Sequence, residues 1–161
     1  GKLPLIRQIL AGFNAYVEGW GLYAEQLGDE IGMYDADWAG RLGYLQAQKF
    51  RAVRLVVDTG LHAKRWSREE AIAYMLANTS NSEDDVVREI ERYVVWPGQA
   101  CAYKTGQLAI IRLRQKAEKT LGERFDLREF HAAVLSSGAV PLDIMEQNVR
   151  DWMARKANEQ R

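Results

Sequence analysis

Proline is scarce in this sequence, and the few prolines divide it into long uninterrupted segments. They stand at positions 4, 97 and 141. Because an internal proline breaks an α-helix, the stretches between these positions are free to be helical throughout. Apolar residues recur there at helical spacing, whereas the alternation typical of strands is scarce. The pattern therefore predicts an all-α fold.

Start and stop signals divide these stretches into individual helices. Ser67 followed by Glu70 is a capping box, and Asp126 is expected to cap the helix after it, with Glu129 as its partner. Pro97 ends the helix that precedes it, and Gly60 suits a helix C-cap. No linker or internal repeat interrupts the chain, so we expect a single multi-helix bundle over residues 1–161. We expect seven helices, at about residues 13–28, 35–59, 67–78, 82–95, 99–121, 127–135 and 141–157.

Charge and apolar run length argue against two classes of partner. Lys+Arg and Asp+Glu each number 22, so the formal net charge is zero. A balanced charge argues against a nucleic-acid binder, which uses a basic surface. No apolar run approaches the roughly 18 residues that a membrane-spanning helix needs. The single cysteine, Cys101, rules out an intrachain disulfide.

An acidic face is expected on the first long helix. Glu18, Leu22, Glu25 and Asp29 follow one another at i, i+4, i+7 and i+11, which places them on one side of a helix. Such a face is either a solvated acidic surface or a carboxylate metal ligand with acidic neighbours, and periodicity alone leaves both interpretations open. Another face carries the residues expected to pack, which are Trp20, Tyr23 and Leu27.

A second concentration of chemistry follows Pro97. Gln99, Tyr103 and Gly106 occupy positions i, i+4 and i+7 of one expected helix. A glycine inside a helix costs about 1 kcal/mol relative to alanine, so Gly106 predicts the close approach of another backbone. Tyr103 is either a packing residue or a donor to a developing oxyanion, and both interpretations stay open.

The chain contains two histidines. His62 follows the expected C-cap at Gly60 and is therefore expected in a loop, either as a capping or surface residue or as a group that binds substrate. His131 lies beside an apolar helix face, which favours a structural role.

Long strings of this sequence resemble a known family. They include NAYVEGWGLYAEQL, RLGYLQ, RLVVDTGLHAKRWSREEAI, RYVVWPGQACAYKTGQL and LGERFDLREFHAAVLSSGAVPLDIMEQNV. In this order they resemble the C-terminal half of domain-of-unknown-function family 885, whose members resemble the gluzincin zinc metallopeptidases. The resemblance covers nearly the whole chain and implies the C-terminal half of a larger helical metallopeptidase fold.

The resemblance also implies roles for particular residues. In the intact parent, an upstream HExxPGH segment would supply two histidine zinc ligands and a glutamate general base that acts on water. Glu18 would be the third protein ligand of the zinc, and Glu25 would orient a neighbouring ligand or helix. Tyr103 would stabilise the oxyanion. Further candidates implied for this cleft are His62 and Tyr93 for catalysis, and Arg92, Gln99 and Lys104 for substrate binding.

The sequence departs from the family pattern in one respect. It contains no HExxH segment, and one carboxylate cannot hold a catalytic zinc. We therefore expect this chain alone to bind no zinc and to be inactive. Its expected partner is the N-terminal half, or a second chain of the same protein, and the parent's substrate would be peptide-like. Helices that evolved to pack on absent polypeptide should expose apolar surface, which predicts self-association.

Two other interpretations remain. The chain could be a helical binding or interaction module without catalysis, or a free-standing structural bundle. The structural bundle fits the composition but leaves the acidic helix face unexplained.

Overall fold

The computed structural model describes residues 3–10 and 12–158, and the regular structure in these residues is entirely helical. All of the expected helices are present, so the prediction of an all-α bundle is confirmed, and α1 is an additional short helix. The elements are α1 (Leu5–Leu10), α2 (Asn14–Glu30), α3 (Trp38–Lys64), α4 (Arg68–Asn78), α5 (Glu83–Val95), α6 (Gln99–Leu121), the 3-10 helix η1 (Gly122–Arg124), α7 (Leu127–Leu135) and α8 (Leu142–Asn158).

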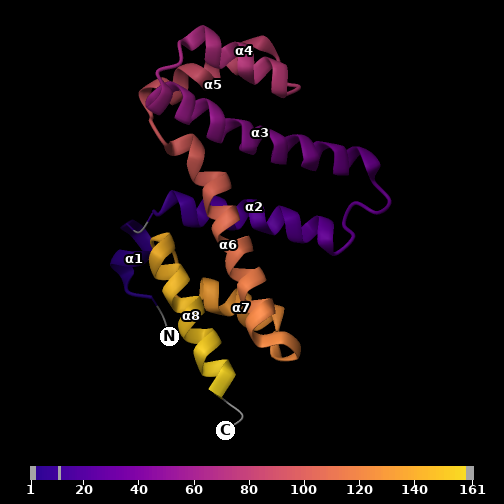
Figure 1. Cartoon of the computed structure of the whole chain (residues 1–161), viewed down its shortest axis with the longest axis vertical. Helices are drawn as coiled ribbons and strands as arrows, with labels where there is room; N and C mark the ends of the chain where they lie inside the picture. Colours follow the sequence, from indigo (N-terminus) through magenta and orange to yellow (C-terminus); the bar gives the residue numbers. More distant parts are fainter. Residues whose placement is uncertain (1–2, 11, 159–161) are drawn as a thin grey trace.

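Helix α6 is the axis of the molecule (Figure 1). Helices α3, α4 and α5 gather around its N-terminal end, and we call this region the α3–α5 lobe. Helices α7 and α8 pack against its C-terminal half together with α2, and we call this region the α7–α8 lobe. Helix α2 crosses α6 between these ends, so the two lobes meet where α2, α3 and α6 come together.

Two glycines allow α2 and α6 to cross in direct backbone contact. A methyl group on Gly106 would lie 1.8 Å from the carbonyl oxygen of Ala15, and one on Gly19 would lie 2.5 Å from the Gly106 backbone. No side chain fits in this space, because these distances are far below van der Waals contact. The close approach predicted for Gly106 is therefore confirmed.

Each lobe has its own buried apolar cluster. In the α7–α8 lobe, Tyr23 and Phe130 are fully buried, and the Tyr16 hydroxyl donates to the Val134 carbonyl oxygen at 2.9 Å. Trp20 and Leu27 pack against this cluster, as their helix face predicted. The cluster of the α3–α5 lobe is formed by Val53, Val57, Ala71, Met75, Val86, Ile90, Tyr93 and Ala100.

The capping signals are also confirmed. The Ser67 side chain accepts from the Glu70 N–H at 3.1 Å, while the Glu70 carboxylate accepts from the Ser67 N–H at 2.7 Å. Asp126 accepts from the Glu129 N–H at 2.9 Å. These side chains satisfy N–H groups that the first turn of a helix leaves unpaired.

The end predicted for α3 is wrong. The helix continues past Gly60 to Lys64, so His62 lies within the helix and not in a loop. Gly60 is instead needed for packing, since a methyl group there would lie 2.4 Å from the Trp66 indole ring. Arg65 ends the helix with a φ of 59°, and its N–H and that of Trp66 donate to the Gly60 carbonyl oxygen.

Candidate functional site

The acidic edge of α2 faces α3. Asp29 accepts a hydrogen bond from Arg41 Nε of α3 at 2.9 Å. Burial raises the pKa of the Tyr44 hydroxyl on α3, and the negative charges of Asp29 and Glu25 raise it further. Glu18 lies on the same edge and is half-buried, whereas Glu25 is exposed. No hydrogen bond joins the Glu18 carboxylate to another residue in the described part of the chain.

Tyr103 belongs to α6, and its side chain packs against α3. Its ring packs against two guanidinium groups of α3, with Arg51 Cζ at 4.3 Å and Arg54 Cζ at 4.5 Å from the ring centroid. The side chain is half-buried, and its hydroxyl has no hydrogen-bond partner among residues 3–10 and 12–158. Tyr103 and Glu18 each lie within one turn of the Gly19–Gly106 crossing, so the fold brings these two candidates to the same junction of helices.

Three other candidates form a cluster around Glu89. The Arg92 guanidinium donates to Glu89 Oε2 at 2.9 Å and to Gln99 Oε1 at 2.8 Å. The Tyr93 hydroxyl donates to the same Glu89 oxygen at 2.7 Å, and burial followed by this hydrogen bond raises the pKa of Tyr93. Tyr93 is buried and its hydroxyl is occupied, which fits a structural role in the α3–α5 lobe.

Lys104 lies where α2, α3 and α6 meet. Its ammonium group donates to Gln48 Oε1 at 2.9 Å and to Gln107 Oε1 at 2.8 Å, and burial lowers its pKa. Gln107 in turn donates to the Leu22 carbonyl oxygen at 3.2 Å and to Gln26 Oε1 at 3.3 Å. Lys104 is therefore held by amide oxygens, and no carboxylate of the described residues pairs with it.

The two histidines make local contacts. His62 Nε2 lies 2.9 Å from the Tyr93 carbonyl oxygen at the end of α5. This contact joins α3 to the C-terminal end of α5 and places the His62 ring against the last turn of α5. His131 Nε2 lies 3.0 Å from the Tyr23 hydroxyl, in line with the structural role expected for it.

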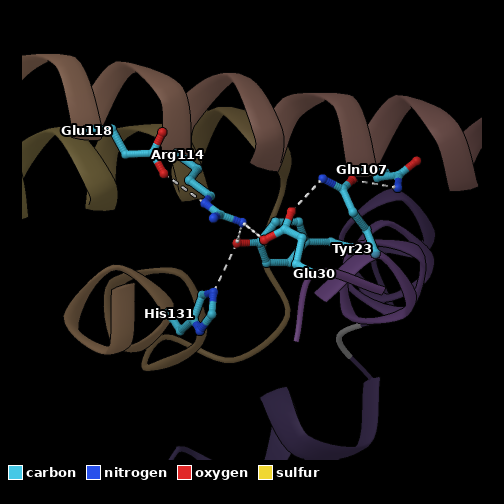
Figure 2. A network of polar contacts seen from close by, with 7 residues as sticks. Tyr23, Glu30, Gln107, Arg114, Glu118 and His131 are labelled. Atoms are coloured by element: carbon cyan, nitrogen blue, oxygen red, sulfur yellow. Dashed lines mark hydrogen bonds and ion pairs between the residues drawn. The ribbon is translucent and has the colours of Figure 1, made fainter. Parts of the chain in front are cut away.

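The contact of His131 is part of a polar network in the α7–α8 lobe (Figure 2). Arg114 Nη1 donates to the Tyr23 hydroxyl at 3.3 Å and to Glu30 Oε2 at 2.7 Å, and its Nε donates to Glu118 at 2.9 Å. Burial lowers the pKa of His131, and the charge of Arg114 lowers it further. Each of these polar side chains has at least one hydrogen-bond partner, and together they join α2, α6 and α7.

Two residues that sequence reasoning missed are Arg51 and Arg54 of α3. Arg54 is 1% exposed, although arginine is almost never fully buried without a partner. A signal was present, because Arg54 and Asp58 stand at i and i+4 within an apolar stretch that includes Val53 and Val57. On an expected helix, the same spacing also fits an exposed ion pair, so it does not by itself predict burial.

The described residues do not form a metal site by themselves. No group of three or more His, Cys, Asp or Glu side chains in residues 3–10 and 12–158 is arranged to hold a metal ion. Glu18 is a half-buried carboxylate without a partner in this part of the chain, so it fits the role of one ligand. A metal site with three or more such ligands would therefore need at least one from outside the described residues. None of the helices described here combines the length and apolarity needed to cross a membrane.

Fold and site together define an all-helical domain whose unpaired polar groups collect at a junction of three helices. The chain belongs to the family described as "Bacterial protein of unknown function (DUF885)", whose profile matches residues 1–149. This confirms the family expected from the sequence strings. A comparison with curated proteins gives no match.

The fold resembles that of a solved structure over nearly the whole chain. It is the crystal structure described as "the putative lipoprotein from Colwellia psychrerythraea", which we call the Colwellia protein. The sequences are 57% identical, the TM-score is 0.91, and the match covers 94% of this chain. It covers 26% of the Colwellia protein, so this chain spans about a quarter of the length of that relative.

Proposed function

We propose that this chain forms one wall of the active-site cleft of a zinc-dependent peptidase. In this proposal Glu18 is one zinc ligand, and the histidine ligands come from polypeptide outside these 161 residues. The length of the Colwellia protein supports the second part, because that relative has about three quarters of its chain beyond the matched region. Exposed apolar side chains such as Leu5, Ile9 and Trp38 are available to pack on such polypeptide.

The observation that carries the proposal is the pair of unpaired groups at one helix junction. The Tyr103 hydroxyl and the Glu18 carboxylate have no partners in the described part of the chain, and both residues lie within one helical turn of the Gly19–Gly106 crossing. Neither group is committed to a hydrogen bond within the described residues, so both are available to a metal and a substrate.

The two side chains would have different roles. Glu18 would hold the metal through its carboxylate, and the metal would supply Lewis-acid polarisation of the peptide carbonyl. Tyr103 would donate its hydroxyl proton in a hydrogen bond to the carbonyl oxygen as negative charge develops there. The guanidinium groups of Arg51 and Arg54, which lie over the Tyr103 ring, would favour that negative charge.

A chimera tests this proposal. In it, this chain replaces the matched quarter of the Colwellia protein. Zinc content would be measured by mass spectrometry, and hydrolysis would be measured on a peptide library. We expect Glu18→Gln to lower zinc occupancy at least about tenfold. We expect Tyr103→Phe to keep the zinc and to slow turnover by about 10²-fold or more, as loss of an oxyanion donor does.

Matched controls separate these effects from changes in folding. Glu69→Gln removes an exposed carboxylate from the first turn of α4, and Tyr74→Phe removes a hydroxyl from the middle of the same helix. Both should leave zinc and turnover unchanged. Full zinc occupancy in the Glu18→Gln chimera would refute the role of Glu18. A zinc-free chimera that binds peptides without cleaving them would favour the alternative, a non-catalytic helical binding module.

A further inference from the structure

The buried polar atoms that lack partners share one chemistry and one helix. In residues 3–10 and 12–158 they are Gln48 Nε2, Arg54 Nε and Arg54 Nη2. All three are N–H donors, and both residues belong to α3. Buried donors without acceptors are costly, so a set composed only of donors indicates that an acceptor is missing from this place.

Arg54 shows how this position is built. Its guanidinium is surrounded by aromatic rings, with its Cζ at 4.5 Å from the Tyr103 centroid, 5.3 Å from the Tyr93 centroid and 5.6 Å from the Phe50 centroid. The carboxylate that approaches it is that of Glu89, with Oε2 at 3.9 Å from Arg54 Nη2. This distance is too long for a hydrogen bond. The rings stabilise the cation but accept none of its conventional hydrogen bonds.

Positive charge exceeds negative charge around Tyr103. The Glu89 carboxylate is shared between Arg92 at 2.9 Å and Arg54 at 3.9 Å. Arg51 has no ion-pair partner among the described residues and makes its contacts with aromatic rings.

Two neighbouring residues leave this excess in place. Lys104 is bonded to amide oxygens only. Asp58 is buried on α3, and its carboxylate oxygens accept from the Gly98 N–H at 3.1 Å. Its negative charge, together with those of Glu89 and Glu18, reduces the excess but does not balance the four cations Arg51, Arg54, Arg92 and Lys104. Uncompensated cations in a partly buried position are strongly unfavourable, which favours the binding of an anion.

We infer that the carboxylate at the C-terminal end of a peptide binds between α3 and α6, beside Tyr103. Arg51 and Lys104 are half-buried and therefore accessible to it, and the carboxylate would also accept from the unpaired nitrogens of Arg54 once the side chains that cover this residue move aside. A carboxylate matches the planar donor pair of an arginine in a bidentate hydrogen bond.

This inference rests on the proposed function, and it specifies the substrate class. If Tyr103 contacts the carbonyl that is attacked, the terminal carboxylate lies a short distance from it, because Arg51 packs on the same ring. A peptide residue spans about 3.3–3.6 Å, so the cleaved bond would be within roughly two residues of the C-terminus. Hydrolysis would then add water across that C–N bond and release a short fragment that carries the terminal carboxylate.

Binding measurements on the chimera test this inference separately from catalysis. Two N-acetylated tetrapeptides with N-methylated, non-cleavable backbones would be titrated by calorimetry, one with a free C-terminal carboxylate and one with a C-terminal amide. We expect the acid to bind at least about tenfold more tightly, since a charge-assisted bidentate hydrogen bond is stronger than one to a neutral amide. Arg51→Gln and Lys104→Gln should each reduce this preference several-fold.

Arg88→Gln is the matched control. It removes an exposed arginine of α5 and should leave the preference for the acid over the amide unchanged. Arg54→Met tests the buried charge and should also weaken the preference. Equal binding of the acid and the amide would overturn the inference, because the missing acceptor would then be an acidic side chain of the longer protein. A preference that survives in both the Arg51→Gln and the Lys104→Gln chimera would also overturn it. A chimera that binds no zinc or cleaves no peptide would refute the proposed function. The comparison of acid and amide binding could still be made on it.

Discussion

The two lobes of this molecule treat buried polar groups differently. In the α7–α8 lobe, the Tyr16 hydroxyl has an acceptor, and Tyr23, His131 and Arg114 form a closed network. In the α3–α5 lobe, Arg54 carries two buried nitrogens without partners, and Gln48 of the same α3 helix carries a third. Both lobes pack around the same helix, and the α7–α8 lobe has the larger apolar cluster. The unpaired donors of the α3–α5 lobe are the feature on which the proposed ligand site depends.

The largest effect is expected where the lobes meet. Gly106→Ala would place a methyl group 1.8 Å from the Ala15 carbonyl oxygen, so α2 must move away from α6. We expect a loss of about 3 kcal/mol in the free energy of unfolding, measured by chemical denaturation. Hydrogen exchange should show lost protection in α2 and the C-terminal half of α6. Protection in α4 and α5 should be retained, because their cluster receives only Ala100 from α6.

Gly21→Ala is the matched control. It lies in the same α2 helix, and a methyl group there meets nothing within 4 Å. Alanine is favoured over glycine inside a helix by roughly 0.5–1 kcal/mol, so this variant should be slightly stabilised. Equal loss of protection in both lobes of the Gly106→Ala protein would show that they unfold as one unit.

A pair of substitutions of intermediate effect compares the polar groups of the two lobes directly. Tyr23→Phe leaves His131 without its partner, and we expect a loss of about 1–2 kcal/mol in the free energy of unfolding. Arg54→Met replaces a buried, incompletely paired cation with an apolar side chain of similar shape, and such replacements are often neutral or stabilising. We expect a change within about 1 kcal/mol. A loss from Arg54→Met larger than that from Tyr23→Phe would contradict the assignment of the α3–α5 lobe as the functional one.

Much of the fold was predictable because its signals are local. The capping pairs Ser67–Glu70 and Asp126–Glu129 depend on residues within one helical turn, and both were predicted. Gly106 predicted a close helix contact because glycine is costly inside a helix. The end of α3 was predicted wrongly because Gly60 is required by the indole ring of Trp66, and a sequence does not show that contact.

The candidate site was predictable in part for the same reason. The sequence placed Gln99 and Tyr103 on one face of a helix, and the structure brings Arg92 of the preceding helix to Gln99. Arg51 and Arg54 were missed because their importance depends on tertiary packing against Tyr103. An arginine on an expected helix is usually at the surface, and its burial becomes visible only in three dimensions.

The smallest expected effect concerns pH and His131. In the neutral tautomer that leaves Nε2 unprotonated, His131 accepts a hydrogen bond from the Tyr23 hydroxyl, and burial lowers the histidine pKa. Arg114 lowers this pKa further, while the negative charge of Glu30 opposes the shift. The unfolded chain, with a histidine pKa of about 6.5, therefore takes up a proton before the folded protein does as the pH falls.

It follows that the contribution of His131 to stability is complete above about pH 6.5 and declines as the pH falls toward the lower pKa of the folded state. His131→Gln keeps an acceptor for the Tyr23 hydroxyl and removes the titration. Its free energy of unfolding should depend less on pH between pH 7 and 5 than that of the parent protein. The check is a series of urea denaturation curves over this range. If the free energy of unfolding depended equally on pH in the two proteins, protonation of His131 would not destabilise the polar network of the α7–α8 lobe.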